Sequence, residues 1–261
     1  MSDAARERAY DPRIELSGSG PPLVLVPGMD GTGRLFYRQL PLLAQRFRVA
    51  TYALRDDAAT MQVLIDDLAT VVRAVAPSGE PVTILGESFG GALAMSFALA
   101  RVAELRALVV LNSFPYFAPQ FRLRLALAGV SVMPWGVMTL IRAGTAARMH
   151  SRFTHRTEIQ RFLQETRATT RRGYLNRLRV LRRYDVRARL HEIRVPTLYI
   201  AADQDHLVPS LEQSRYMASL VPGASVHVLE GHGHICLIAP NVDLESILRS
   251  WEERRNGDTR G

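Results

Sequence analysis

The five residues Gly86-Glu87-Ser88-Phe89-Gly90 constrain the fold of this chain more than any other segment. The run before them, 81–85, is apolar and β-branched, as in a buried parallel strand. The run after them, 92–100, is rich in Ala, Leu and Met, as in a helix. Glycines on both sides let the strand and the helix approach closely without Cβ clashes. A serine on the sharp turn between these elements presents its Oγ at the helix N-terminus, so Ser88 is a candidate nucleophile.

A serine nucleophile needs a base and an acid that orients the base, and candidates for both follow later in the chain. The predicted strand 196–202 is followed by Asp203 and Asp205. The predicted strand 224–229 is followed by His232 and His234. The carboxyl ends of parallel strands meet at one edge of a sheet, where open α/β folds hold their ligands. Either aspartate and either histidine satisfies the order serine, acid, histidine.

At these motifs the chain resembles the α/β-hydrolase superfamily, and the resemblance covers roughly residues 14–251. In that family the acid commonly lies in the pattern G-x-x-D-x-x-V-P. Residues 202–209 match it, except that Ala202 stands in place of the first glycine. This register implies Asp205 as the acid of the triad, with Asp203 as the alternative.

The resemblance also implies the remaining catalytic groups. The family's histidine pattern, G-x-G-H, matches residues 231–234 and selects His234 as the base, with His232 as the alternative. The oxyanion hole is expected from the backbone N–H groups of Met29 and Phe89. Family members often have a histidine where this chain has Pro27, so any contact of that ring is missing here.

These groups imply a serine hydrolase of the carboxylesterase or lipase type, which cleaves a carboxylic ester or thioester through an acyl-enzyme. Two alternatives stay open: an acyltransferase with the same triad, and a hydrolase-like protein that binds a ligand without catalysis. No cofactor or metal is expected, since the chain has neither a nucleotide-binding glycine motif nor the Cys/His spacing of a structural zinc site. Glu87 is expected to be a structural residue at the helix flank, with tuning of His234 as the alternative.

Positive charge is concentrated in residues 114–194, which hold 17 of the 33 arginines and only 4 of the 25 acidic residues. The family inserts its helical cap between the corresponding strands, so a cap is expected at 114–194. Its apolar first half, 114–143, favours a small-molecule substrate with an apolar acyl part. The arginines make peripheral contact with an anionic lipid or an acidic carrier a further expectation. Nucleic acid is not an expected partner, because no reading motif is present.

The remaining pattern predicts an α/β fold with a mostly parallel sheet and helices on both faces. Its core is expected at 14–113 and 195–253, with disorder at 1–13 and 254–261. The polar start of the chain lacks the apolar stretch of a signal peptide, which favours a cytoplasmic protein, with the arginines allowing contact with a membrane surface. Strands are predicted near 22–26, 48–53, 81–86, 106–112, 196–202 and 224–229, and helices outside the cap near 35–46, 60–76, 89–102, 209–221 and 241–254.

Overall fold

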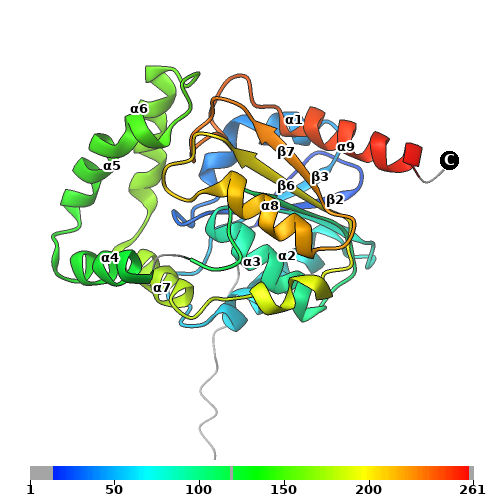
Figure 1. The fold of residues 1–261 in the computed structure, drawn as a ribbon, viewed down its shortest axis with the longest axis horizontal. Helices are drawn as coiled ribbons and strands as arrows, with labels where there is room; N and C mark the ends of the chain where they lie inside the picture. Colours follow the sequence, from blue (N-terminus) through cyan, green and yellow to red (C-terminus); the bar gives the residue numbers. More distant parts are fainter. Residues whose placement is uncertain (1–13, 118–119, 259–261) are drawn as a thin grey trace, which may run out of the picture.

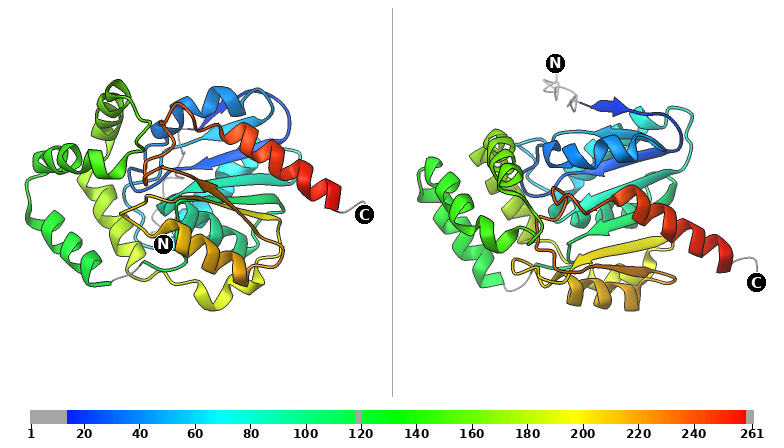
Figure 2. Two further views of the ribbon diagram at one scale, coloured as in Figure 1. Left: turned by 45° about the horizontal axis from the view of Figure 1, so that its top comes forward. Right: turned by 90° about the horizontal axis from the view of Figure 1, so that it is seen from above.

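The computed structural model describes residues 14–117 and 120–258. At its centre is a sheet in the order β1-β3-β2-β4-β5-β6-β7, in which every neighbouring pair is parallel except β1 and β3 (Figures 1 and 2). The strands are β1 (Glu15–Ser17), β2 (Pro22–Val26), β3 (Arg48–Thr51), β4 (Val82–Glu87), β5 (Leu105–Leu111), β6 (Thr197–Ala202) and β7 (Ser225–Leu229). The predicted α/β fold with a mostly parallel sheet is confirmed.

Helices cover both faces of the sheet, because successive side chains of a buried strand point to opposite faces. Val24 and Val26 of β2 belong to the apolar cluster formed with α2, α3 and α8. Leu23 and Leu25 belong to the cluster formed with η1, α1 and α9. The helices are η1 (Arg34–Arg38), α1 (Leu40–Leu43), α2 (Met61–Val75), α3 (Phe89–Ala100), α8 (Ser210–Leu220) and α9 (Leu244–Asp258).

Most of the chain between β5 and β6 forms a separate group of helices at one end of the sheet (Figures 1 and 2). An isolated bridge between His150 and Ile235 joins this group to the loop after β7. Its elements are α4 (Gln120–Val132), α5 (Gly136–Met149), α6 (Arg156–Glu165), η2 (Thr166–Ala168) and α7 (Arg171–Leu181). The last element before β6, η3 (Arg187–Glu192), lies apart from this group and contacts α8.

The uncharged stretch 125–141 is divided between α4 and α5, with Pro134 in the connection. Proline lacks the N–H that a continuous helix needs, so the helix breaks at Pro134. In the part of the chain that the structure describes, no helix has both the length and the apolar character required to cross a membrane.

The structure corrects the predicted elements at three places. The helix expected at 35–46 is the 3-10 helix η1 followed by α1, because Pro41 interrupts the hydrogen-bond ladder. Strand β1 is too short and too exposed to give a sequence pattern. The disorder expected at 254–261 is wrong for residues 254–258, which continue α9. There the Arg255 guanidinium lies over the buried ring of Trp251. Residues 1–13 and 259–261 lie outside the described ranges.

Candidate active site

Ser88 sits on a sharp turn between the end of β4 and the start of α3. Its backbone has φ 54° and ψ −115°, a conformation that non-glycine residues rarely adopt. Neighbouring backbone holds the turn, because Ser88 N donates to Leu111 O at 2.8 Å and Ser113 Oγ donates to Ser88 O at 2.7 Å. A Cβ at Gly86 would meet the backbone of Gly90, which is why the turn needs glycine there. The strained turn presents the Ser88 hydroxyl at the N-terminus of α3.

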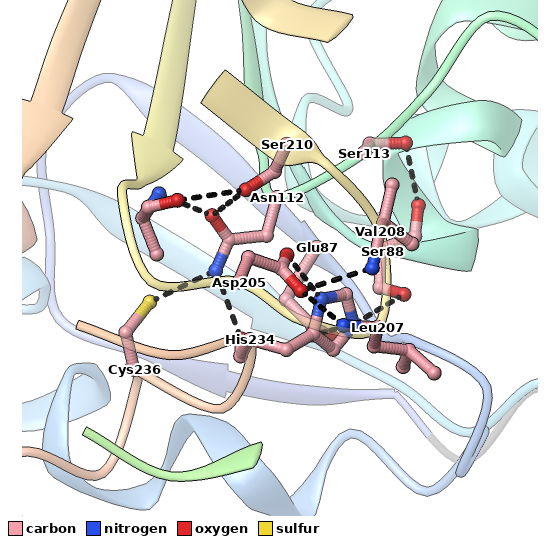
Figure 3. A network of polar contacts seen from close by, with 11 residues as sticks. Glu87, Ser88, Asn112, Ser113, Asp205, Leu207, Val208, Ser210, His234 and Cys236 are labelled. Atoms are coloured by element: carbon pink, nitrogen blue, oxygen red, sulfur yellow. Dashed lines mark hydrogen bonds and ion pairs between the residues drawn. The ribbon is translucent and has the colours of Figure 1, made fainter. Parts of the chain in front are cut away.

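The structure brings Ser88, His234 and Asp205 together as the sequence predicted (Figure 3). His234 Nε2 lies 3.0 Å from Ser88 Oγ, and His234 Nδ1 lies 2.7 Å from Asp205 Oδ2. The other oxygen of Asp205 accepts from the backbone N–H groups of Leu207 at 2.9 Å and Val208 at 3.0 Å. The Asp205 side chain is fully buried and the histidine nearly so. These contacts fix the carboxylate, and the carboxylate orients the imidazole toward the serine.

The alternative acid and base have other contacts. Asp203 accepts from Gly231 N at 2.6 Å, so it holds the loop that leads to His234. His232 pairs with Asn241 at 3.3 Å and its ring packs against Phe153. Neither side chain is bonded to Ser88 or to His234 in the structure. The geometry therefore favours the register that the family pattern selected.

The expected oxyanion donors, Met29 and Phe89, line the same cavity as Ser88. Phe89 is the first residue of α3, and the first N–H groups of a helix have no intrahelical acceptor. Met29 lies in a tight turn closed by a hydrogen bond of 3.0 Å from Gly31 N to Gly28 O. Both residues therefore line the cavity with Ser88, where oxyanion donors are expected.

Glu87 lines the cavity beside His234, which differs from the expected position at the helix flank. Its carboxyl packs against Gly28, where a Cβ would collide with Glu87 Oε2. Glu87 Oε1 lies 4.0 Å from His234 Nε2, on the same side of the ring as Ser88. Burial raises the pKa of Glu87 to about 7, against the opposing effect of His234. The carboxyl therefore changes charge near neutral pH, within reach of the base.

The pKa of His234 is the balance of opposing effects. Burial lowers it, whereas the charge and the hydrogen bond of Asp205, together with the charge of Glu87, outweigh burial and raise it above the ordinary value. A general base must be neutral to accept the proton of Ser88. Hydrolysis is therefore expected to rise with pH through the titration of His234.

Glu87→Gln is expected to move the acidic limb of the kcat/KM profile to lower pH. The substitution removes a carboxyl that is partly ionised near pH 7 and lies 4.0 Å from His234 Nε2, so the imidazolium loses stabilisation and its pKa falls. The plateau rate at higher pH is retained, because Ser88, His234 and Asp205 keep their contacts. Initial rates from pH 5 to 9 measure the shift. Glu230→Gln, an exposed carboxyl on the histidine loop, is the matched control and leaves the profile in place.

Asn112, at the carboxyl end of β5, is a residue of the site that the sequence reasoning missed (Figure 3). Its Nδ2 donates to His234 O at 2.8 Å, and its Oδ1 accepts from Ala202 N at 2.8 Å. It also contacts Ser210 and Cys236 and is fully buried, with φ 46°. Asn112 thus joins the ends of β5 and β6 to the histidine loop. The sequence signal for this role is the position of Asn112, a polar residue directly after the apolar strand β5.

Asn112→Gly is expected to lower the free energy of unfolding by about 2–4 kcal/mol, because it leaves the buried His234 carbonyl and Ala202 N–H without their partner. Glycine accepts the positive φ, so the change isolates the loss of the side chain. Equilibrium urea unfolding measures the effect. Asn241→Ala, an exposed asparagine, is the comparison and should cost far less. Equal costs would show that Asn112 has no special structural role.

A cavity of about 420 Å³ opens beside Ser88 and is lined mainly by apolar side chains. Helices α4 to α7 each contribute to its wall; examples are Ala126, Met138, Phe162 and Leu178. Its size lies in the range of small-molecule sites, which are typically apolar with a few polar groups that orient the ligand. Within the described residues, no group of three or more His, Cys, Asp and Glu side chains is arranged to hold a metal ion.

Residues 23–244 match the model of the alpha/beta hydrolase family, so this chain belongs to that family. A relative from Yersinia enterocolitica, provisionally named carbamate hydrolase RutD, is 28% identical over 255 residues, with 91% of each chain covered. The pimeloyl-[acyl-carrier protein] methyl ester esterase of Stenotrophomonas maltophilia is 30% identical over 241 residues, which cover 85% of this chain and 88% of the relative. The names of these relatives support a hydrolase of this family.

The solved structure of a thermophilic esterase from Thermogutta terrifontis has a similar fold. It superposes with a TM-score of 0.81 at 22% sequence identity, and 93% of each chain is covered. At this identity the likeness concerns the fold alone.

Proposed function

We propose that the chain is a serine hydrolase that cleaves a carboxylic ester or thioester with an apolar acyl part. The observation that carries the proposal is the hydrogen-bonded series Ser88, His234 and Asp205, of which Ser88 and His234 line an apolar cavity. The relative from Stenotrophomonas maltophilia, named as a methyl ester esterase, adds support for ester substrates. The relative named as a carbamate hydrolase supports attack on a related acyl group.

In the proposed reaction Ser88 Oγ attacks the carbonyl carbon while His234 Nε2 accepts its proton. The carbonyl oxygen becomes an oxyanion beside the N–H groups of Met29 and Phe89. Collapse of the intermediate breaks the bond to the alcohol or thiol, which leaves with the proton from His234. Water then attacks the acyl-enzyme with His234 again as the base, which releases the acid and restores Ser88.

Two groups of interactions lower the barrier. Asp205 stabilises the imidazolium that forms on His234, and the proton stays on the imidazole. The backbone donors stabilise the oxyanion more than the neutral ester, and one such donor contributes about 2.7–4 kcal/mol in comparable sites. The contacts of Asp205 with Leu207 and Val208 are in place before substrate arrives, so little reorganisation is needed.

We also infer that residues 114–194 act as a cap on a hydrolase core formed by 14–113 and 195–253. The inference is supported by the walls of the cavity, since Ala126, Met138, Phe162 and Leu178 all belong to that segment. The reacting groups belong to the core. The core would then hold the reacting groups, and the cap would select the acyl part.

Hydrolysis of p-nitrophenyl esters from acetyl to palmitoyl, with Ser88→Ala alongside, tests the function. We expect a rate that peaks at one chain length and falls to background in Ser88→Ala. A p-nitrophenyl carbamate and an added alcohol acceptor are assayed in parallel. Faster turnover of the carbamate than of the esters would change the proposed substrate from an ester to a carbamate. Ester formed in place of free acid would indicate a transferase. Activity that survives in Ser88→Ala would contradict the proposed nucleophile.

Ala126→Trp is expected to shift the preference toward shorter acyl chains. Ala126 is half-buried on α4 and lines the cavity, so an indole ring would occupy part of the space for the acyl group. Discrimination of this kind changes kcat/KM about 10-fold or more for the longer esters, with the acetyl ester little affected. Steady-state kinetics across the ester series measure it. Ala128→Trp, exposed on the same helix, should leave the preference unchanged.

A further inference from the structure

The side chain of Arg177 on α7 is buried against the loop that carries the expected oxyanion donor Met29. It is 2% exposed. Its Nε donates to Met29 O at 3.0 Å and its Nη2 donates to Asp30 O at 3.2 Å. Its Nη1 lies 3.8 Å from Asp56 Oδ1, an ion pair. A buried guanidinium is stable only with such partners, so its position is tied to this loop.

The direction of the Met29 N–H follows from the turn in which it lies. In a trans peptide unit the C=O of Gly28 and the N–H of Met29 share one plane and point in opposite directions. Gly28 O accepts from Gly31 N inside the turn, at 3.0 Å. The Met29 N–H therefore points out of the turn, and any tilt of the turn redirects this donor.

Arg177 donates to the carbonyls of this turn that accept from no backbone N–H of the described residues. Gly28 O is bonded within the turn, and Gly31 O accepts from Leu54 N at 2.8 Å. The two carbonyls between them, those of Met29 and Asp30, are the ones that accept from Arg177. The guanidinium thus fixes the two peptide units that follow the donor.

The loop also leaves room for this guanidinium. Gly31 has φ +71°, and a Cβ at this position would come within 2.5–2.8 Å of three atoms of the Arg177 guanidinium. Nearby, Asn176 Nδ2 donates to Asp56 O at 2.8 Å, which gives α7 a second contact with the core. The fit is specific to an arginine, because a lysine ammonium cannot span both carbonyls with a planar fork.

The same helix lines the acyl cavity. Tyr174, Leu178 and Leu181 of α7 lie on its wall together with Ser88. Arg177 therefore links the wall that would contact the acyl part to the turn that would stabilise the oxyanion.

We propose that Arg177 is a positioning residue that sets the direction of the Met29 N–H and thereby couples α7 to the oxyanion hole. The inference rests on the proposed hydrolase function and assigns no contact between Arg177 and the substrate. Loss of the guanidinium lowers stabilisation of the transition state, while binding of the neutral substrate is preserved.

Steady-state kinetics of Arg177→Lys and Arg177→Met on the best p-nitrophenyl ester test the proposal. We expect kcat to fall about 10- to 100-fold in both variants with KM within a few-fold of wild type, since small displacements of a catalytic group carry penalties of this size. Arg183→Met, which removes an exposed charge two residues after the end of the same helix, is the control and retains wild-type kcat. Unchanged kcat in folded Arg177→Lys would overturn the proposal.

A pair of ketones separates positioning from general loss of structure. Ser88 Oγ adds to the carbonyl carbon of an alkyl trifluoromethyl ketone while its proton passes to His234, which forms an oxyanion, whereas the matching methyl ketone binds without reaction. We expect Arg177→Lys to weaken the first ligand about 10-fold or more and the second hardly at all. Equal weakening of both ligands, together with a lower melting temperature, would show a structural role and overturn the proposal. If wild type neither hydrolyses esters nor binds the fluoroketone, the hydrolase function itself fails, which is a separate result.

Discussion

His234→Ala is expected to lower kcat for ester hydrolysis about 10⁶-fold, the size of the loss when a triad base is removed from a comparable site. His234 Nε2 is the group that meets Ser88 Oγ, at 3.0 Å, so without it the serine has no base and the leaving group has no acid. KM should change little, because the imidazole contributes little to binding the acyl part. Single-turnover kinetics with a p-nitrophenyl ester measure the loss.

The matched control is His232→Ala. This histidine is also buried and lies two residues away, but it contacts Asn241 and Phe153 and does not reach the serine. We expect most of the wild-type kcat to remain. A large loss in His232→Ala with activity retained in His234→Ala would reverse the assignment.

Asp205→Asn is expected to lower kcat about 10⁴-fold, because the amide favours the wrong tautomer of the imidazole and withdraws the charge that stabilises the imidazolium. Asp205 lies 2.7 Å from His234 Nδ1 and is held by the N–H groups of Leu207 and Val208. The asparagine keeps the size of the carboxyl, so circular dichroism and the melting temperature report whether the fold is intact. The pH profile should also change, since Asp205 raises the pKa of His234.

Asp203→Asn is the comparison for this variant. Its amide oxygen can still accept from Gly231 N, so the histidine loop keeps its anchor. Activity close to wild type is expected. If Asp203→Asn and Asp205→Asn lost equal activity, the two carboxylates would have to act together, and the assignment of a single acid would be wrong.

The sheet and the order of the predicted site residues could be inferred from the sequence because their signals are local. The turn at Ser88 is indicated by five consecutive residues, 86–90, and the acid and histidine each follow an apolar strand. The parallel sheet then brings the carboxyl ends of β4, β6 and β7 to one edge. Local composition also explains the break between η1 and α1, because Pro41 lies within the single helix predicted at 35–46.

The supporting residues could not be predicted because their partners are far away in the chain. Asn112 is 122 residues from His234, and Arg177 is 148 residues from Met29. Arg177 is one of 17 arginines in 114–194, and no motif distinguishes it. One signal was present: Gly173, Leu178 and Leu181 are buried on the same helix, so an arginine at 177 falls on the buried face.

The orientation of Glu87 depends on tertiary structure in the same way. It is the last residue of β4, next to Ser88, and the space for its carboxyl is provided by Gly28, which follows β2. The sequence placed Glu87 at the helix flank, with tuning of His234 as the alternative, but only the assembled sheet shows that its carboxyl faces His234.

Mass-spectrometric mapping of the adduct formed with a fluorophosphonate tests the central claim most directly, namely that Ser88 is the nucleophile of a serine hydrolase. The predicted result is a single adduct on the peptide that contains Ser88, absent in Ser88→Ala and greatly slowed in His234→Ala, with esterase activity lost in proportion to labelling. An adduct on another residue, or esterase activity that persists after complete labelling of Ser88, would contradict it.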